Sequence, residues 1–299
     1  MNIAIFILNI PLEGGKQVKS RVIKVVSSLA IGLGIALSPA SSYAATPKSI
    51  KVHYIDVGQG DSIYIKAPNG EDIVIDGGNK GKGNSVVSYL KKQKVDDIEV
   101  LISTHPDADH IGGLDEVINA FKVENVYAPK VSNTTQAYKD FLNAVKKKKL
   151  TIKTAQAGVK LPVKDVNAQI VGPVKTYATS DLNDWSAVVH IAYKKNTFLF
   201  TGDAEAKAEA DMIKAKKTLR ADVLKVGHHG AKTSTSKNFL NVVKPKYAVI
   251  SVGKNSYGHP TSQVVNLLKG AKASILRTDQ SGTIIITGNG TSYSVNKSR

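Results

Sequence analysis

The sequence predicts an α+β protein in which two β-sheets are covered by helices. Short apolar runs bounded by Gly, Asn and Asp dominate the first part of the chain, and segments with helical spacing separate later groups of strands. Because the strands come in groups, a simple β-α-β succession is not expected. The 299 residues contain no internal repeat or long linker after Ala45, which favours a single domain from about Ser49 to Val295.

The predicted strands are short apolar runs that end in turn-forming residues. They are Ile50–Val57, Ser62–Ala67, Asp72–Ile75, Val100–Ser103, Ala168–Val171, Ala187–Tyr193, Thr197–Phe200, Val223–Val226, Tyr247–Ser251, Ser274–Leu276 and Thr283–Thr287. The predicted helices carry apolar residues on one face. They contain or span Val86–Leu90, Leu114–Phe121, Phe141–Val145, Ala204–Lys216, Thr235–Val242 and Ser262–Lys269. The first three strands follow one another directly, which predicts a meander.

The first 44 residues have the layout of a secretory signal peptide. A basic cluster between Lys16 and Lys24 precedes an apolar stretch, Val25–Leu37, that is short for a membrane span. Ser42-Tyr43-Ala44 then resembles a cleavage site, with Ala45 as the expected first mature residue. Residues 45–299 are therefore expected to form a secreted, extracellular domain with no stable membrane span. An uncleaved membrane anchor is the alternative, and the long apolar segment before the basic cluster leaves a later translation start open.

Composition narrows the chemistry. The chain has no cysteine, which excludes disulfides and thiolate metal sites.

Its formal net charge is +17, and removal of residues 1–44 takes away four basic residues and Glu13, which leaves +14. Such an excess on a secreted domain favours polyanionic partners such as nucleic acid or an anionic cell wall. Adhesion to the envelope without a role in catalysis is the alternative, and the run Lys146–Lys149 is typical of a solvated helix end.

The loop after the fourth predicted strand concentrates potential metal ligands. His105, Asp107, Asp109 and His110 lie within six residues, between a strand and a helix. A short loop can turn alternate side chains towards one point, and the Gly112-Gly113 pair lets the backbone pass closely behind them. An apolar strand that runs into this pattern predicts a metal site held by His and Asp side chains.

The run His105-Pro106-Asp107-Ala108-Asp109-His110 resembles the H-x-H-x-D-H signature of the metallo-β-lactamase superfamily, with Asp107 where the second His usually stands. That variant is similar to the hydrolase domain of the ComEC-type competence proteins, the DNA-uptake channel family. Further matches follow in the expected order at Asp56–Asp61, Asp76–Gly78, Thr201–Asp203, Val226–Gly230, Tyr257–Pro260 and Arg277–Asp279. The resemblance covers nearly all of residues 45–299. It implies a hydrolase with a four-layer αββα sandwich, two mixed sheets flanked by helices, and a site at the strand ends.

The resemblance also implies a site for one or two divalent metal ions. Asp203 would bridge two ions, since a carboxylate can supply a shared oxygen, and a helix N-cap is the alternative role for this residue. The implied ligands are His105 and Asp107 for one ion, and Asp109, His110 and His229 for the other, with His228 as the alternative to His229. We favour His229 because it directly precedes Gly230, as in related H-G motifs.

Other residues are expected to support this site or to contact substrate. Asp61 and Asp76 are interpreted as carboxylates that orient the ligands. Where the wider superfamily has a third-motif His, this chain has a segment with Asn183 and Ser186, similar to the N-x-x-S-x-V of the ComEC-type group. Nearby His190 is interpreted as a packed strand residue. One metal site is therefore short of a protein ligand, and the oxygen-rich set shifts the preference from zinc towards manganese, with zinc left open.

The favoured hypothesis is a secreted, non-specific DNase that hydrolyses phosphodiester bonds with a metal-activated water. The candidate catalytic residues are Asp109 and His259, although a structural role in the Gly-His-Pro turn is an equal alternative for His259. Lys225, Lys232 and Lys254 are expected around the cleft, where they would contact phosphates without reading bases.

Two other functions are left open. One is a phosphodiesterase acting on envelope polymers of the teichoic acid or phosphocholine type, and the other is a non-catalytic extracellular DNA-binding protein. A β-lactam substrate fits less well, because the enzymes that hydrolyse β-lactams resemble the form with the third-motif His present. The sequence specifies no oligomeric state.

Overall fold

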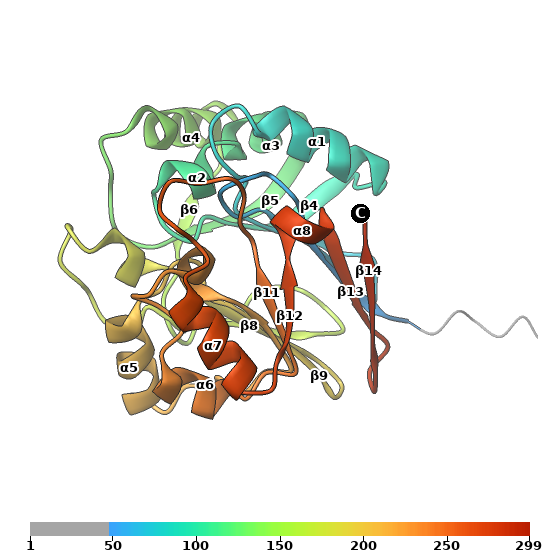
Figure 1. Ribbon diagram of the computed structural model, residues 1–299. Coiled ribbons are helices and arrows are strands. Elements are labelled where there is room, and N and C mark those ends of the chain that lie inside the picture. The colour runs from blue at the N-terminus through green and yellow to red at the C-terminus, as the bar shows by residue number, and fades with distance from the viewer. Residues whose placement is uncertain (1–47) are drawn as a thin grey trace, which may run out of the picture. The chain divides into compact units, whose positions relative to one another are not determined.

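The computed structural model describes residues 48–299 (Figure 1). The predicted signal peptide, residues 1–44, and its cleavage site lie outside the described residues. Among residues 48–299, none of the helices combines the length and the apolar character that crossing a bilayer requires.

The first of two β-sheets has eight strands in the order β14-β13-β1-β2-β3-β4-β5-β6. Their bounds are β1 Ile50–Tyr54, β2 Ile63–Lys66, β3 Asp72–Ile75, β4 Asp97–Ile102, β5 Lys122–Ala128, β6 Ile152–Thr154, β13 Ile284–Gly288 and β14 Tyr293–Lys297. Strands β3 to β6 are parallel, and the pairs from β14 to β3 are antiparallel. The sheet is therefore mixed, with one parallel half whose strands end at a common edge.

The second sheet has six strands in the order β12-β11-β10-β9-β8-β7. Their bounds are β7 Asn167–Gly172, β8 Val188–Tyr193, β9 Asn196–Phe200, β10 Val223–Lys225, β11 Tyr247–Ile250 and β12 Ser274–Arg277. Strands β9 to β12 are parallel, whereas β7 and β8 are antiparallel. Because the carboxyl ends of parallel strands meet at one edge, the loops after β9, β10, β11 and β12 lie side by side.

Helices cover the outer face of each sheet (Figure 1). The bounds are α1 Gly83–Lys92, α2 Ala108–Ile111, α3 Leu114–Ala120, α4 Gln136–Lys147, α5 Ala206–Lys214, α6 Lys237–Val243, α7 Ser262–Gly270 and α8 Thr278–Ser281. One apolar core lies between the sheets, a second under α1, α3 and α4, and a third under α5, α6 and α7. The predicted four-layer αββα sandwich is confirmed.

Strand β1 shows how the sequence assigns side chains to the two faces of a sheet. Ile50, Val52 and Tyr54 are buried in the core between the sheets. Successive side chains of a strand point to opposite faces, so His53 turns towards the outer helices. Its Nδ1 lies 2.8 Å from the hydroxyl of Tyr89 on α1, and the imidazole is buried.

Most predicted elements are confirmed with shifts of a few residues at their ends. The sequence pattern does not predict β5, in which the polar residues Glu124 and Asn125 interrupt the apolar run. It also misses β14, whose side chains are partly exposed because it is an edge strand, and which continues past the expected domain end at Val295. Both strands lack a strong apolar alternation. They form because β5 pairs with β4 and β14 pairs with β13.

His53 should make the protein less stable in mild acid. Burial, reinforced by Lys51, lowers the pKa of His53 from 6.5 to about 4, so below pH 6.5 the unfolded chain binds a proton that the folded protein does not. Between pH 7 and pH 5 this should cost about 2 kcal/mol. Urea unfolding of the protein and of His53→Gln at both pH values measures the difference. Equal losses in the two proteins would show that His53 is not responsible.

Candidate metal centre

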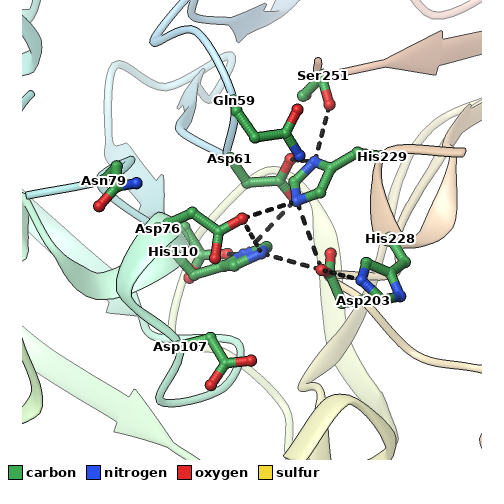
Figure 2. A network of polar contacts seen from close by, with 12 residues as sticks. Gln59, Asp61, Asp76, Asn79, Asp107, His110, Asp203, His228, His229 and Ser251 are labelled. Carbon is green, nitrogen blue, oxygen red and sulfur yellow. Dashed lines mark hydrogen bonds and ion pairs between the residues drawn. The ribbon is translucent and has the colours of Figure 1, made fainter. Parts of the chain in front are cut away.

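Three loops at strand ends bring the candidate ligands together (Figure 2). The segment after β4, a short loop that runs into α2, carries residues 105–110. The loop after β9 carries Asp203, and the loop after β10 carries His228 and His229. The first of these loops comes from one sheet and the other two come from the second sheet. The site therefore exists only when both sheets pack together.

The turn after β1 closes the site from the side. The backbone N–H of Asp61 donates to the carbonyl of Asp109 at a distance of 3.1 Å. Gly60 has φ +130, and a Cβ at this position would overlap the same carbonyl. Gly60 in the motif Asp56–Asp61 is therefore required for close approach of two backbones beside a candidate ligand.

Asp203 is the centre of the cluster. Its Oδ2 atom lies 3.2 Å from His110 Nε2, 3.4 Å from His229 Nε2 and 3.7 Å from His228 Nε2 (Figure 2). The carboxylate is buried. A helix N-cap role is wrong for Asp203, because α5 begins at Ala206 and its N-cap residue is Glu205.

A buried carboxylate orients the ring of His110. His110 Nδ1 lies 2.9 Å from Asp76 Oδ2 and must donate there, because a carboxylate only accepts. Asp76 in turn accepts from the backbone N–H and the hydroxyl of Thr104, at 2.8 and 2.7 Å. With Nδ1 as the donor, the Nε2 of the neutral ring presents a lone pair towards Asp203. Asp76 thus orients His110, one of the candidate ligands.

A backbone carbonyl orients His229 in the same way. Its Nδ1 donates to the carbonyl of Ser251 at 2.8 Å. Its Nε2 then faces Asp109 Oδ2 at 3.1 Å as well as Asp203. Both His229 and His110 therefore direct their second ring nitrogen at carboxylates.

These contacts fit a bound cation. A lone pair on Nε2 and a carboxylate oxygen repel each other unless a proton or a metal ion lies between them. Ligand bonds of about 2.0–2.2 Å place two ligand atoms roughly 3–3.5 Å apart, which is the spacing around Asp203. The buried Nε2 atoms of His105 and His110 have no hydrogen-bond partner among the described residues. The residues present fit a divalent metal ion.

Without a metal ion, a proton can lie between each imidazole and its carboxylate. The pKa values of these groups then reflect how closely the opposite charges approach each other. Burial lowers the pKa of His110, but Asp203 and Asp109 outweigh burial and hold it well above its usual value. The pKa of His229 is raised for the same reason, mainly by Asp203 against the opposing effect of burial. Burial raises the pKa of Asp203, but His110 and His229 outweigh it and hold the carboxyl ionised. The site thus holds its carboxylates in the form that binds metal.

Among the described residues, three groups have ligand atoms that all lie within 4.8 Å of one another. They are His105 with His110 and Asp203, Asp109 with His110 and His229, and Asp61 with Asp76 and His110. The first two are the candidate metal sites, and they share His110 and border Asp203.

Two implied ligands lie differently from the rest. His105 is fully buried at the centre, with its ring centroid 4.2 Å from that of His110. Asp107 is half-buried and belongs to none of the three groups, although its Oδ2 lies 3.4 Å from His105 Nε2. In Figure 2 it lies apart from the network around Asp203. The structure therefore places Asp107 at the edge of the site.

His228 is fixed by a residue that the sequence reasoning missed. Its Nδ1 lies 3.2 Å from Glu205 Oε1, which also accepts from Asn183 Nδ2 at 3.1 Å and from the hydroxyl of Thr233 at 2.9 Å. Asn183 thus supports His228. The signal for Glu205 was its place two residues after Asp203, at the start of a predicted helix.

The rest of the third-motif segment supports the fold. The hydroxyl of Ser186 accepts from the backbone N–H of Asp203 at 3.0 Å, which fixes the loop that carries this carboxylate. His190 is buried in β8, and its Nε2 donates to the carbonyl of Arg220 at 3.0 Å. The interpretation of His190 as a packed strand residue is confirmed.

Lys225 does not lie on the cleft surface, and that prediction is wrong. Its side chain is fully buried, and its ammonium donates to the carbonyl of Gly202 at 3.0 Å. The same Nζ forms an ion pair with Asp61 and lies 3.7 Å from Asp203 Oδ1. Burial lowers the pKa of Lys225, but the two carboxylates outweigh burial and raise it. Lys225 is therefore a buried counter-charge for Asp61 and Asp203. Because Asp61 is paired with this lysine, it lies beside the candidate ligands without being one of them.

The cluster opens into a hollow of about 180 Å³ whose lining includes Asp109, Asp203 and His259. A larger hollow of about 720 Å³ shares Asp107 and Asn183 with it. The larger hollow is lined by two exposed lysines, Lys207 and Lys232, together with the carboxylates of Asp107, Asp181, Asp184 and Glu205. A substrate longer than the small hollow can extend into the larger one.

The sequence model of the metallo-β-lactamase superfamily matches residues 55–254. The chain belongs to this superfamily. The match includes the three segments that carry the candidate ligands, so the candidate metal site lies within the part of the chain that matches the superfamily.

Curated relatives confirm the resemblance to the ComEC-type competence proteins. ComE operon protein 3 of Bacillus subtilis is 32% identical over 252 residues, which cover 78% of this chain and 32% of that protein. Recombination protein 2 of Haemophilus influenzae is 33% identical over 240 residues, with 78% and 28% covered. Competence protein ComA of Neisseria gonorrhoeae is 30% identical over 231 residues, with 77% and 31% covered. The chain spans about a third of the length of these relatives.

Solved structures show the same fold at low identity. The metallo-β-lactamase fold protein YhfI from Bacillus subtilis superposes with a TM-score of 0.54 at 11% identity, covering 81% of this chain and 100% of that one. CmlA, a diiron β-hydroxylase from Streptomyces venezuelae, gives 0.53 at 12% identity, with 84% and 55% covered. These likenesses establish the fold and no shared activity.

Removal of the buried lysine should destabilise the metal-free protein. In Lys225→Met, Asp61 and Asp203 lose their counter-charge while they stay buried, which should cost about 3–5 kcal/mol. Lys207→Met is the matched control, because Lys207 pairs with Asp181 at 3.0 Å on the surface and its loss should change stability little. Urea unfolding measures both variants. A Lys225→Met protein as stable as the control would contradict the counter-charge role.

His229 and His228 should differ in their effect on metal binding. His229→Ala removes a nitrogen that faces two carboxylates, and we expect the affinity for Mn²⁺ or Zn²⁺ to fall more than about tenfold. His228→Ala should retain more of the affinity, because its Nε2 has only the 3.7 Å approach to Asp203. Calorimetric titration of the metal-free proteins compares them. A larger loss in His228→Ala would reverse the choice between the two histidines.

Proposed function

We propose that this protein is a metal-dependent phosphodiesterase that hydrolyses extracellular DNA without sequence preference. The observation that carries the proposal is the cluster around Asp203, in which His110 and His229 direct lone pairs at this buried carboxylate next to an open hollow. Such an arrangement binds a divalent ion and leaves room beside it for a phosphate group.

A divalent ion, when bound, lowers the pKa of a water molecule and neutralises charge on phosphate oxygens. The residues of the chain hold and orient this chemistry. Asp109, His110, Asp203 and His229 supply the ligand atoms, with His105 behind them. Asp76 and Ser251 keep the His110 and His229 rings in the tautomers that leave Nε2 free. These three imidazoles and two carboxylates suit zinc as well as manganese, and both are candidates for the native metal.

His259 is placed to contact the substrate. It lines the small hollow, and its Nδ1 is buried without a hydrogen-bond partner among the described residues. Burial lowers its pKa, and His228 and His229 lower it further, so the ring is neutral at neutral pH. A neutral His259 can donate one hydrogen bond to a phosphate or leaving oxygen, which supports a positioning role over that of a charged acid.

Charge and relatives support DNA as the substrate. The similarity to relatives named for competence and recombination supports a role in DNA uptake. The formal net charge of +17, or +14 after residue 44, suits a polyanion. Lys232, an exposed lysine that borders the larger hollow, would contact phosphates, which carry no sequence information. We propose that the protein acts outside the cytoplasm after cleavage before Ala45.

Digestion of plasmid and linear DNA is the test. The chain from Ala45 onward is incubated without metal and then with Mn²⁺, Zn²⁺ or Mg²⁺, with an Asp109→Ala/His110→Ala double variant as the control. We expect metal-dependent cleavage that the double variant lacks, because it removes ligand atoms from both candidate sites. The product pattern distinguishes cleavage within the strand from cleavage at its ends.

Two outcomes would redirect the assignment. Hydrolysis of a small phosphodiester without cleavage of DNA would favour an envelope phosphodiester such as teichoic acid. Tight DNA binding that survives chelation, with no cleavage by any metal, would favour the non-catalytic DNA-binding role.

A further inference from the structure

Tyr257 is the most exposed large apolar side chain among the described residues. It is 72% exposed, whereas Val242 and Leu142 are 38% and 36% exposed. A single exposed aromatic residue is common on protein surfaces. This one, however, lines the hollow that contains Asp109 and Asp203, so it lies at the entrance of the catalytic site.

The loop that carries Tyr257 is held in one conformation. Asn255 Oδ1 accepts from the backbone N–H groups of Tyr257 and His259, at 3.1 and 3.0 Å. Its Nδ2 donates to the carbonyls of Gly253 and His259, both at 2.8 Å. Gly258, with φ +75, provides the left-handed backbone between the two rings. The exposed ring is therefore presented by a rigid loop.

Tyr257 also packs on a residue of the site. Its ring stacks on that of His259, with centroids 5.6 Å apart and an angle of 29° between the planes. His259 in turn contacts His228 edge to face, at a centroid distance of 5.4 Å. An aromatic surface thus runs from the cluster around Asp203 to the solvent, and the outer ring stays mostly uncovered.

We propose that Tyr257 is a stacking platform for an unpaired nucleobase next to the scissile phosphate, and that the preferred substrate is single-stranded DNA. The proposal rests on the proposed function and names its substrate class. Every base has a π-face, so stacking on a tyrosine ring binds a strand without reading its sequence. Bases in a duplex already stack on each other, and only an unpaired or frayed nucleotide can transfer its stacking to Tyr257.

Oligonucleotides with and without bases test the platform. Hydrolysis of a single-stranded oligonucleotide is compared with that of an abasic strand of equal length, in the wild type, Tyr257→Ala and Tyr257→Phe. We expect Tyr257→Ala to raise KM for the normal strand about tenfold more than for the abasic strand, with kcat less affected. Tyr257→Phe keeps the ring and should behave as the wild type. Leu142→Ala, an exposed apolar residue on α4, is the matched control.

A binding measurement keeps this proposal separate from the proposed function. Fluorescence anisotropy of labelled strands in the absence of metal needs no cleavage. Tighter binding of the normal than of the abasic strand by the wild type, lost in Tyr257→Ala, supports the platform even if no metal restores DNA cleavage. Equal binding of both strands by the wild type, or equal effects of Tyr257→Ala on both strands, overturns it.

Discussion

The structure depends on a concentration of buried negative charge at the meeting point of the two sheets. Asp61, Asp76 and Asp203 are almost fully buried, and their mutual repulsion must be offset within the protein. Lys225 offsets part of it from inside β10, and the imidazoles offset the rest when they carry protons or share a metal ion. The fold therefore leaves an excess of buried negative charge at this point, which a divalent cation can neutralise.

The same constraint explains the backbone around the site. The ligands come from loops after β4, β9 and β10, which belong to different sheets, so the core between the sheets must form before the ligands meet. Polar side chains behind the ligands then fix each ring, as Asp76 and Thr104 do for His110 and as Ser251 does for His229. Rigid support of this kind sets which nitrogen is free to bind and at what spacing.

In the proposed function, two features next to this fixed centre would contact the substrate. Lys232, which borders the larger hollow, would contact phosphates. His259 and Tyr257 form an aromatic surface that ends in solvent. Charge and stacking would both act on groups that every nucleotide shares. Together they fit a polymer substrate whose sequence the site does not read.

The sequence by itself determined the layer architecture and the main ligand loop. Alternating and helical apolar patterns are local, and residues 105–110 form one short stretch that runs into α2. Neighbours along the chain therefore carried the signal. Only the tertiary structure decided roles that depend on distant partners. The sequence pattern suggested that Lys225 lies in the cleft, but packing buries it beside Asp61. His229 differs from His228 because its Nδ1 donates to the carbonyl of Ser251, a contact that no local pattern predicts. Burial and orientation arise from contacts between segments far apart in the chain, and no local pattern contains them.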